Sequence, residues 1–192
     1  MADDKPVPIR KPRADGERNR QRLLEVARAS FAARGAGASL EEIARSAGVG
    51  IGTLYRHFPN RDSLIADVYR QAIGQLGEAA NRLAVDRPPI EARREWMLLF
   101  VDYLATKKIM GDALNTLSAG TAELYASSGS QLEASVDLLA ANAVRAGGIR
   151  LDIVPLDLLR AIAAVANGST DTGGNGAARR MVDIVIAGLS SG

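Results

Sequence analysis

The sequence predicts an all-α protein of about nine helices, and three observations lead to this fold class. Apolar residues recur with the three-to-four spacing of helices along most of the 192 residues, while few stretches alternate apolar with polar residues. The breaks in this pattern carry glycine or proline, the residues that most often end helices, at 35–37, 88–89 and 147–148. Ser39 and Asn60 stand directly before helical patterns, where their side-chain oxygens cap the first N–H groups.

The N-terminal segment divides into an arm and a helix. Residues 1–14 mix three prolines with four basic residues and cannot be helical throughout, because proline lacks the backbone N–H that a helix needs. We therefore expect a flexible basic arm over 1–14. Asp15 is placed to cap a first helix, which we expect to end near Arg34, before two glycines.

The next segment, SLEEIARSAGVGIGTLYRHF, has the pattern of two short helices joined by a tight turn. Ser39 and Glu42 form the S-x-x-E capping box, which predicts the start of a second helix. Gly48 follows that helix, at a position where a positive φ is favoured. A third helix is expected over Ile51–His57. Together these features predict a helix-turn-helix rather than an ordinary helical hairpin, which is the alternative.

The residue pattern of the remaining two thirds of the chain predicts a body made of helices. Proline or asparagine stands at the start of three of its helical segments, and glycines mark breaks at 147–148 and within 167–176. The stretch 167–176, NGSTDTGGNG, predicts a flexible loop. We expect helices at 61–85, 89–108, 112–117, 121–146 with a candidate break at 127–130, 155–166 and 177–189.

Charge is distributed unevenly along the chain, although the net charge is only +2. Residues 1–61 carry 12 Lys and Arg against 7 Asp and Glu, whereas residues 71–192 carry 11 against 13. A basic N-terminal part on a nearly neutral body indicates that the N-terminal part contacts a polyanion such as DNA.

The scarcity of several residue types excludes whole classes of function. The chain has no cysteine and a single histidine, which excludes disulfides, thiol catalysis and cysteine- or histidine-based zinc sites. It has no phosphate-binding loop and no nucleophile paired with a base. We therefore expect no metal, no cofactor and no catalytic residue, so that the protein is not an enzyme.

No apolar run approaches the roughly 20 residues that a membrane-spanning helix needs. The N-terminus also lacks the apolar stretch of a secretory signal. We expect a cytoplasmic protein without membrane contact.

Residues 19–68 resemble the N-terminal DNA-binding domain of the tetracycline-repressor (TetR) family. The resemblance rests on the small residue Ala44, the turn Gly48-Val49 and the string Thr53-Leu54-Tyr55-x-x-Phe58. Arg61 stands where a lysine is more usual, which keeps the charge but changes the contact geometry. Beyond residue 70 the similarity is architectural only.

The resemblance implies a ligand-responsive transcriptional regulator, usually a repressor, that binds a palindromic operator as a homodimer. It divides the chain into the arm (1–14), a helix-turn-helix domain (15–60) and a helical ligand-binding and dimerisation domain (61–192). The alternative is a DNA-binding regulator or architectural protein whose body binds a protein partner instead of a small-molecule inducer. A helical interaction module that binds no nucleic acid is a further alternative.

The resemblance also assigns residues to DNA. Tyr55 is expected to contact a phosphate through its hydroxyl, the alternative being a core tyrosine. Arg61 lies at a helix N-terminus, where the helix dipole favours phosphate, and its alternative is a solvated surface arginine. Thr53 and His57 are one turn apart and should share the groove face. Independently of the resemblance, the basic residues Arg10, Lys11 and Arg13 of the arm are candidates for minor-groove or backbone contact, and the alternative is a solvated tail. The expected DNA-contacting set is Arg13, Ser39, Gly50, Gly52, Thr53, Tyr55, Arg56, His57 and Arg61.

Gly50 and Gly52 are unusual at the start of a recognition helix, because each glycine weakens a helix by roughly 1 kcal/mol. They allow the backbone to approach the major groove closely and leave few side chains to contact bases. We therefore expect DNA shape and the arm to contribute to specificity.

The last two predicted helices are apolar on more than one face, which predicts a dimer interface, with a buried monomer core as the alternative. The expected interface residues are Leu159, Ile162, Ala163, Ala166, Met181, Val182, Val185, Ile186 and Leu189. An aromatic and apolar set in the body predicts a pocket for an apolar or amphipathic effector, with core packing as the alternative. The expected pocket residues are Trp96, Phe100, Tyr103, Met110, Leu114, Thr121, Leu124 and Tyr125.

Overall fold

The computed structural model describes residues 12–147, 154–168 and 175–189, and within them the protein is all-α, as predicted. This described part contains no strand. None of its helices is both long and apolar enough to cross a bilayer. The elements are α1 (Pro12–Arg34), the 3-10 helix η1 (Gly35–Gly37), α2 (Leu40–Ser46), α3 (Ile51–His57), α4 (Arg61–Asp86), α5 (Pro89–Ile109), α6 (Gly111–Leu114), α7 (Ala122–Arg145), α8 (Pro155–Gly168) and α9 (Asn175–Leu189).

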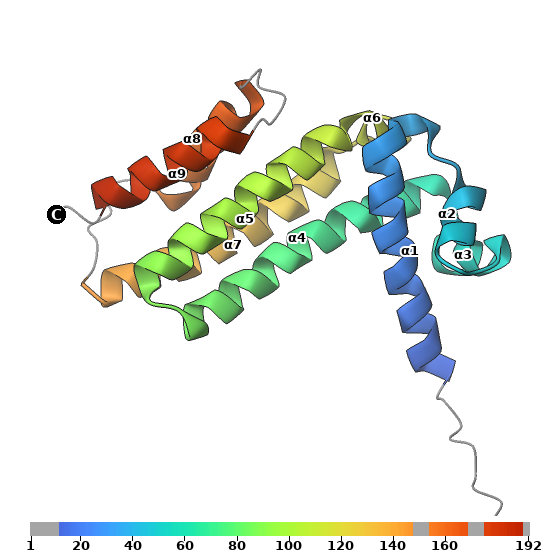
Figure 1. Ribbon diagram of the computed structural model, residues 1–192, viewed down its shortest axis with the longest axis horizontal. Helices are drawn as coiled ribbons and strands as arrows, with labels where there is room; N and C mark the ends of the chain where they lie inside the picture. Colours follow the sequence, from blue (N-terminus) through green and yellow to red (C-terminus); the bar gives the residue numbers. More distant parts are fainter. Residues whose placement is uncertain (1–11, 148–153, 169–174, 190–192) are drawn as a thin grey trace, which may run out of the picture.

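The helices form two regions joined by α4 (Figure 1). Helices α1, α2 and α3 gather around the N-terminal end of α4, while α5 and α7 lie alongside the rest of it. Helices α8 and α9 pack together and cover the side of α5 that faces away from α4. Because α4 belongs to both regions, any tilt of it relative to the body moves the helix-turn-helix.

One hydrophobic core runs through both regions. In the small domain, formed by α1, α2, α3 and the start of α4, this core contains Phe31, Leu54 and Phe58, which are all fully buried. It continues along α4 through Leu64 and Val68 into the body without a break. Burying each large apolar side chain contributes about 1.5–3 kcal/mol, so these contacts hold α2 and α3, which are too short to be stable alone.

Several of the expected helix boundaries require correction. Helix α1 begins at Pro12 instead of Asp15, since proline fits the first position of a helix, where its missing N–H is not needed. Arg13 therefore belongs to α1 and not to an arm, whereas residues 1–11, including Arg10 and Lys11, lie outside the described residues. The loop expected over 167–176 is shorter, because α8 extends to Gly168 and α9 begins at Asn175, while 169–174 are not described.

Helix α7 is continuous where a break was a candidate. The hydroxyls of Ser127 and Ser128 both donate to the carbonyl of Leu124, at 3.1 and 2.7 Å, and Ser130 donates to the carbonyl of Ala126. Serine hydroxyls in a helix can bond the carbonyl three or four residues back, so this serine-rich stretch does not interrupt α7.

Candidate nucleic-acid interface

The N-terminus of α2 is capped as the sequence predicts, but only half of the capping box forms. Ser39 has the extended backbone of an N-cap residue, and its Oγ accepts a hydrogen bond from the Glu42 N–H at 3.3 Å. The Glu42 carboxylate forms an ion pair with Arg34. The Ser39 hydroxyl donates to Glu41 Oε2 at 2.9 Å. Ser39 thus has a structural role that competes with its expected contact to DNA.

The turn between α2 and α3 depends on Gly48, which has a φ of +70°. Its N–H donates to the carbonyl of Arg45 and the N–H of Val49 donates to that of Ala44, both at 3.0 Å, forming a Schellman motif. Ala44 of α2 is buried in the core, where a larger side chain would displace its neighbours. The turn thereby sets the angle at which α3 leaves α2.

Helix α3 packs through Leu54, with Thr53 and His57 partly buried, and leaves its other residues exposed. Leu54 is fully buried, whereas Tyr55 is 45% exposed and Arg56 is exposed as well. Helical geometry places Gly52 and Arg56 furthest from Leu54, with Thr53 and His57 on one flank. The exposure of Tyr55 excludes the alternative that it is a core tyrosine.

The two glycines before and within α3 are not required by the packing of the protein itself. Gly50 is the N-cap residue, with a φ of −73°, and Gly52 is helical. A Cβ added at either position meets no atom within 4 Å. Any demand for a bare backbone at Gly50 and Gly52 therefore comes from a partner outside the chain.

The set of DNA-contacting residues expected from the sequence does not include Ile51, the first residue of α3, although its side chain is accessible. Its side chain is 37% exposed and lies on the same flank of the helix as Tyr55. An isoleucine in this apolar context is normally assigned to the core. The signal that would have identified it is its position between two glycines, which have no side chains to cover it.

Arg61 has a different environment from the one expected. Its Nη1 donates to the carbonyl of Ala38 at 2.5 Å and its Nη2 to the carbonyl of Ala36 at 2.6 Å. The guanidinium carbon also lies 5.2 Å from the ring centre of Phe31, in cation–π contact. Arg61 therefore connects the start of α4 to the segment between α1 and α2, and a phosphate contact would have to use its remaining N–H groups.

The first turn of α4 also has an intramolecular cap. Asn60 Oδ1 accepts from the Ser63 N–H at 2.8 Å, and Ser63 Oγ accepts from the Asn60 N–H at 3.3 Å. This reciprocal capping box was predicted only in part, since the sequence indicated Asn60 alone.

In the body, the predicted effector residues are spread over α5, α6, α7 and the residues that join them, and most of them are buried. Trp96 and Phe100 are buried and stacked with ring centres 6.0 Å apart, and the Trp96 Nε1–H donates to the carbonyl of Leu76 at 2.8 Å. The Tyr103 hydroxyl donates to that of Tyr69 at 2.7 Å. The remaining predicted residues comprise three that are buried, Met110, Leu114 and Leu124, and two that are partly buried, Thr121 and Tyr125.

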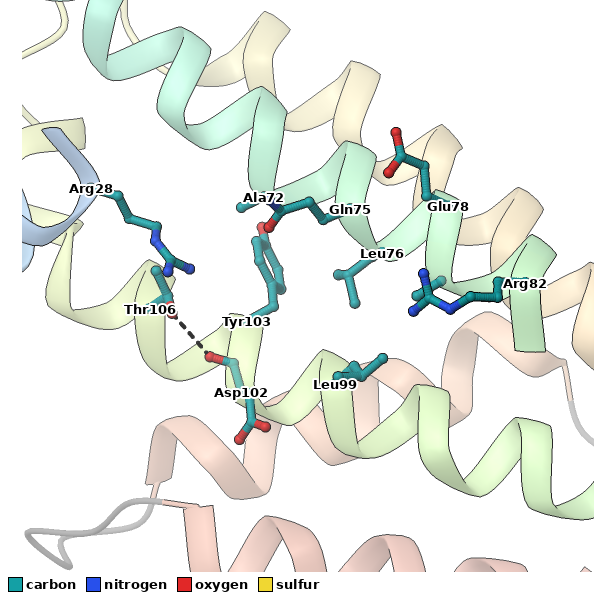
Figure 2. Close-up of a pocket in the computed structure, with 11 residues that line it drawn as sticks. Arg28, Ala72, Gln75, Leu76, Glu78, Arg82, Leu99, Asp102, Tyr103 and Thr106 are labelled. Atoms are coloured by element: carbon teal, nitrogen blue, oxygen red, sulfur yellow. Dashed lines mark hydrogen bonds between the residues drawn. The ribbon is translucent and has the colours of Figure 1, made fainter. Parts of the chain in front are cut away.

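An open cleft of about 350 Å³ lies between α1, α4 and α5 (Figure 2). Arg28 of α1 and Arg82 of α4 point into it from opposite ends, and Tyr103 lies between them. Tyr103 is the only predicted effector residue in this cleft. A second cleft of similar volume, beside the start of α4, includes Leu124.

The expected dimer residues divide into two groups. Leu159, Ile162, Ala166 and Val182 are at most 7% exposed and are covered by their own chain, with α8 and α9 packed on α5. They belong to the protomer core, which corrects that part of the expected interface. Ala163, Met181, Val185 and Ile186 are partly buried, and the Leu189 side chain lies outside the described residues. Ile184, which is not in the expected set of interface residues, is 66% exposed.

The all-helical fold, with a capped helix-turn-helix whose second helix has an open face, defines a DNA-binding regulator. Residues 23–68 match the family described as bacterial regulatory proteins, tetR family, and residues 88–191 match a transcriptional regulator SbtR-like C-terminal domain. The chain belongs to the TetR family of transcriptional regulators, whose members bind DNA and function as dimers.

Solved structures of similar proteins agree with this assignment. A TetR transcriptional regulator from Streptomyces coelicolor is 38% identical, with a TM-score of 0.80 over 89% of this chain and 98% of that one. A TetR regulatory protein from Mycobacterium vanbaalenii is 32% identical, with a TM-score of 0.77 over 94% and 99%. An HTH-type transcriptional regulator from Staphylococcus aureus strain USA300 is 32% identical over 114 residues. That match covers 58% of this chain and 60% of the relative, so it spans less than two thirds of the relative's length.

Proposed function

We propose that the protein is a ligand-responsive repressor that binds a palindromic operator as a dimer, with α3 in the major groove. The observation that carries this proposal is the open face of α3, which is held outward by the burial of Leu54 and Phe58. On that face Tyr55 and Arg56 are accessible to phosphate, and Gly50 and Gly52 allow close approach of the backbone. This activity would place the protein with DNA in the cytoplasm.

The proposed dimer uses the outer faces of α8 and α9. Their inner faces pack on α5, which leaves Ile184 and the partly buried Met181 and Val185 on or near the surface. A two-fold axis there presents two copies of α3 to one side of DNA. Successive major-groove faces are about 34–36 Å apart, so the dimer geometry decides whether both copies bind.

The proposed response to an effector is a population shift between two dimer geometries. Helix α4 connects the sites, and Asp62 at its start accepts a hydrogen bond from the Ser118 N–H at 2.9 Å. That contact joins α4 to the segment between α6 and α7. Arg20 of α1 also pairs with Asp67 of α4 at 2.7 Å. Displacement of the body helices would therefore move α1 and α4 together, and with them α3.

Selection of binding sites from random DNA duplexes at two salt concentrations tests the proposal. The expected product is an inverted repeat whose affinity falls steeply with salt, because phosphate contacts release counterions. Tyr55→Phe should weaken binding to all selected sequences alike, with Tyr125→Phe in the body as the matched control. Enrichment of no sequence, or of a single asymmetric site, would contradict the proposed dimeric repressor.

A further inference from the structure

Arg93 is the only charged side chain that is buried in the described part of the chain, with 1% of its surface exposed. Its Nε, Nη1 and Nη2 have no hydrogen-bond partner among the described residues. Arginine remains protonated in proteins and is almost never fully buried unless it is paired. Burial lowers the pKa of Arg93 below its ordinary value, which reflects the same loss of solvation.

The position of Arg93 directs it into the interior of the body. Arg93, Met97, Phe100 and Leu104 lie at i, i+4, i+7 and i+11 and share one face of α5. All four are buried, and α5 packs against α4, α7, α8 and α9. The next residue, Arg94, is exposed and pairs with Asp183 of α9 at 2.7 Å. Two consecutive arginines thus have opposite environments.

The described interior offers no counter-ion for Arg93. The other buried polar residues are Ser128 and Ser135 of α7, and neither carries charge. Their hydroxyls donate to carbonyls of α7 itself, at 2.7 and 2.9 Å. No carboxylate is buried in the described part of the chain. Among the described residues of the body, the guanidinium therefore lacks both the opposite charge and the hydrogen-bond acceptors that it needs.

We propose that Arg93 binds the carboxylate of an organic acid effector whose apolar skeleton lies along the same face of α5. The inference rests on the proposed function, because it names the chemical class that the body recognises. A carboxylate can accept two parallel hydrogen bonds from a guanidinium, and Met97 and Phe100 provide apolar contact for the skeleton. A neutral effector would leave Arg93 unpaired. Since Arg93 is closed to solvent, binding requires the helices around it to separate, which couples occupancy to helix packing.

Thermal unfolding of the full chain tests this proposal with a defined series of probes. The probes are benzoate, 4-phenylbutyrate and decanoate, each compared with its neutral amide. At least one acid should raise Tm by several degrees while its amide does not, since ligands that bind only the folded state stabilise it. Trp96, the single tryptophan of the chain, lies one turn from Arg93, so its fluorescence should change with the same acid.

Two variants make the test specific. Arg93→Met keeps an apolar side chain of similar length and should abolish the response to the acid, whereas Arg94→Met, the exposed control, should retain it. Without ligand, Arg93→Met should raise Tm, because it removes a buried unpaired charge. Arg93→Lys should retain a preference for acid over amide with at least tenfold weaker affinity, and it serves if the methionine variant does not fold.

Three results would overturn the proposal. They are the absence of any acid-dependent shift in the wild type, equal shifts with acids and amides, and a lower Tm for ligand-free Arg93→Met than for Arg94→Met. The last result would mean that Arg93 is already paired within the chain. DNA binding is measured on the same samples, so an acid response without operator binding removes the proposed function alone.

Discussion

The helix-turn-helix end and the body differ in how completely their polar side chains are hydrogen-bonded. In the helix-turn-helix end Ser39, Asn60 and Arg61 all bond backbone groups, so that short helices are held at a defined angle. In the body Arg93 and the buried Nε2 of Gln71 have no hydrogen-bond partner among the described residues. The DNA-binding end is thus built for one shape, whereas the body contains groups that a bound molecule or a rearrangement would satisfy.

The largest effect is expected from the small core of the DNA-binding end. Phe58→Ala removes a fully buried ring and should lower the free energy of unfolding by about 3–5 kcal/mol, through lost burial and a cavity. Urea unfolding measures this value. Tyr55→Ala, at an exposed ring of α3 three residues earlier, should cost less than about 1 kcal/mol. Equal losses for the two variants would show that this end lacks the rigid core described for it.

Backbone conformation should produce the next largest effect. Gly48→Ala places a Cβ at a φ of +70° and should destabilise the fold by about 1–2 kcal/mol, although no atom obstructs the new Cβ. Gly50→Ala, at a φ of −73°, is the control. Alanine is a poorer N-cap than glycine but also restricts the unfolded chain, so the two effects oppose each other and stability should change by only a few tenths of a kcal/mol. The denaturant midpoints of the two variants measure this difference in stability. Equal midpoints would show that the positive φ of Gly48 is not needed for the turn between α2 and α3.

Two single substitutions, one in each region, compare the regions directly. Asn60→Ala removes the cap of α4 and should cost about 1 kcal/mol. Gln71→Met replaces a side chain whose buried nitrogen lacks a partner and should leave stability unchanged or raise it by up to about 1 kcal/mol. Calorimetry measures the change in stability of each variant, and changes of opposite sign would support the contrast between the regions. A Gln71→Met variant that is less stable than the wild type would contradict it.

A small change in stability, and the most informative result for DNA binding, is expected at Gly52. Gly52→Ala should stabilise α3 by roughly 0.5–1 kcal/mol because the added methyl group meets open space. If the bare backbone is needed in the groove, the same variant should bind the operator at least tenfold more weakly. Binding titrations with the selected operator measure this, and unchanged affinity would show that the glycine is not there for DNA.

Features that depend on a few neighbouring residues could be predicted from the sequence. Ser39, Gly48 and Asn60 sit at helix ends, and their roles follow from local backbone chemistry, which is why the helix-turn-helix was correctly located. Helix periodicity also predicted the order of helices in the body.

Features that depend on which helix face meets which neighbour could not be predicted. Leu159 and Val182 belong to faces that pack on α5, but an apolar helix face has the same pattern whether it meets its own chain or a partner. The hydrogen bonds of Arg61 could not be foreseen either, because the carbonyls that accept them, those of Ala36 and Ala38, lie more than 20 residues earlier in the sequence. Likewise, nothing in the consecutive arginines at 93 and 94 indicates which of them is buried.

The continuous core along α4 has a consequence for engineering. Chimeric regulators are made by exchanging sensing domains between DNA-binding domains, and such exchanges succeed when the parts fold independently. Here Leu64 and Val68 belong to the same core as Phe58 on one side and the body on the other. A cut at residue 60 would therefore leave both pieces with exposed apolar surface. A functional chimera would have to retain α4 together with the small domain and redesign the surface on which α5 and α7 pack.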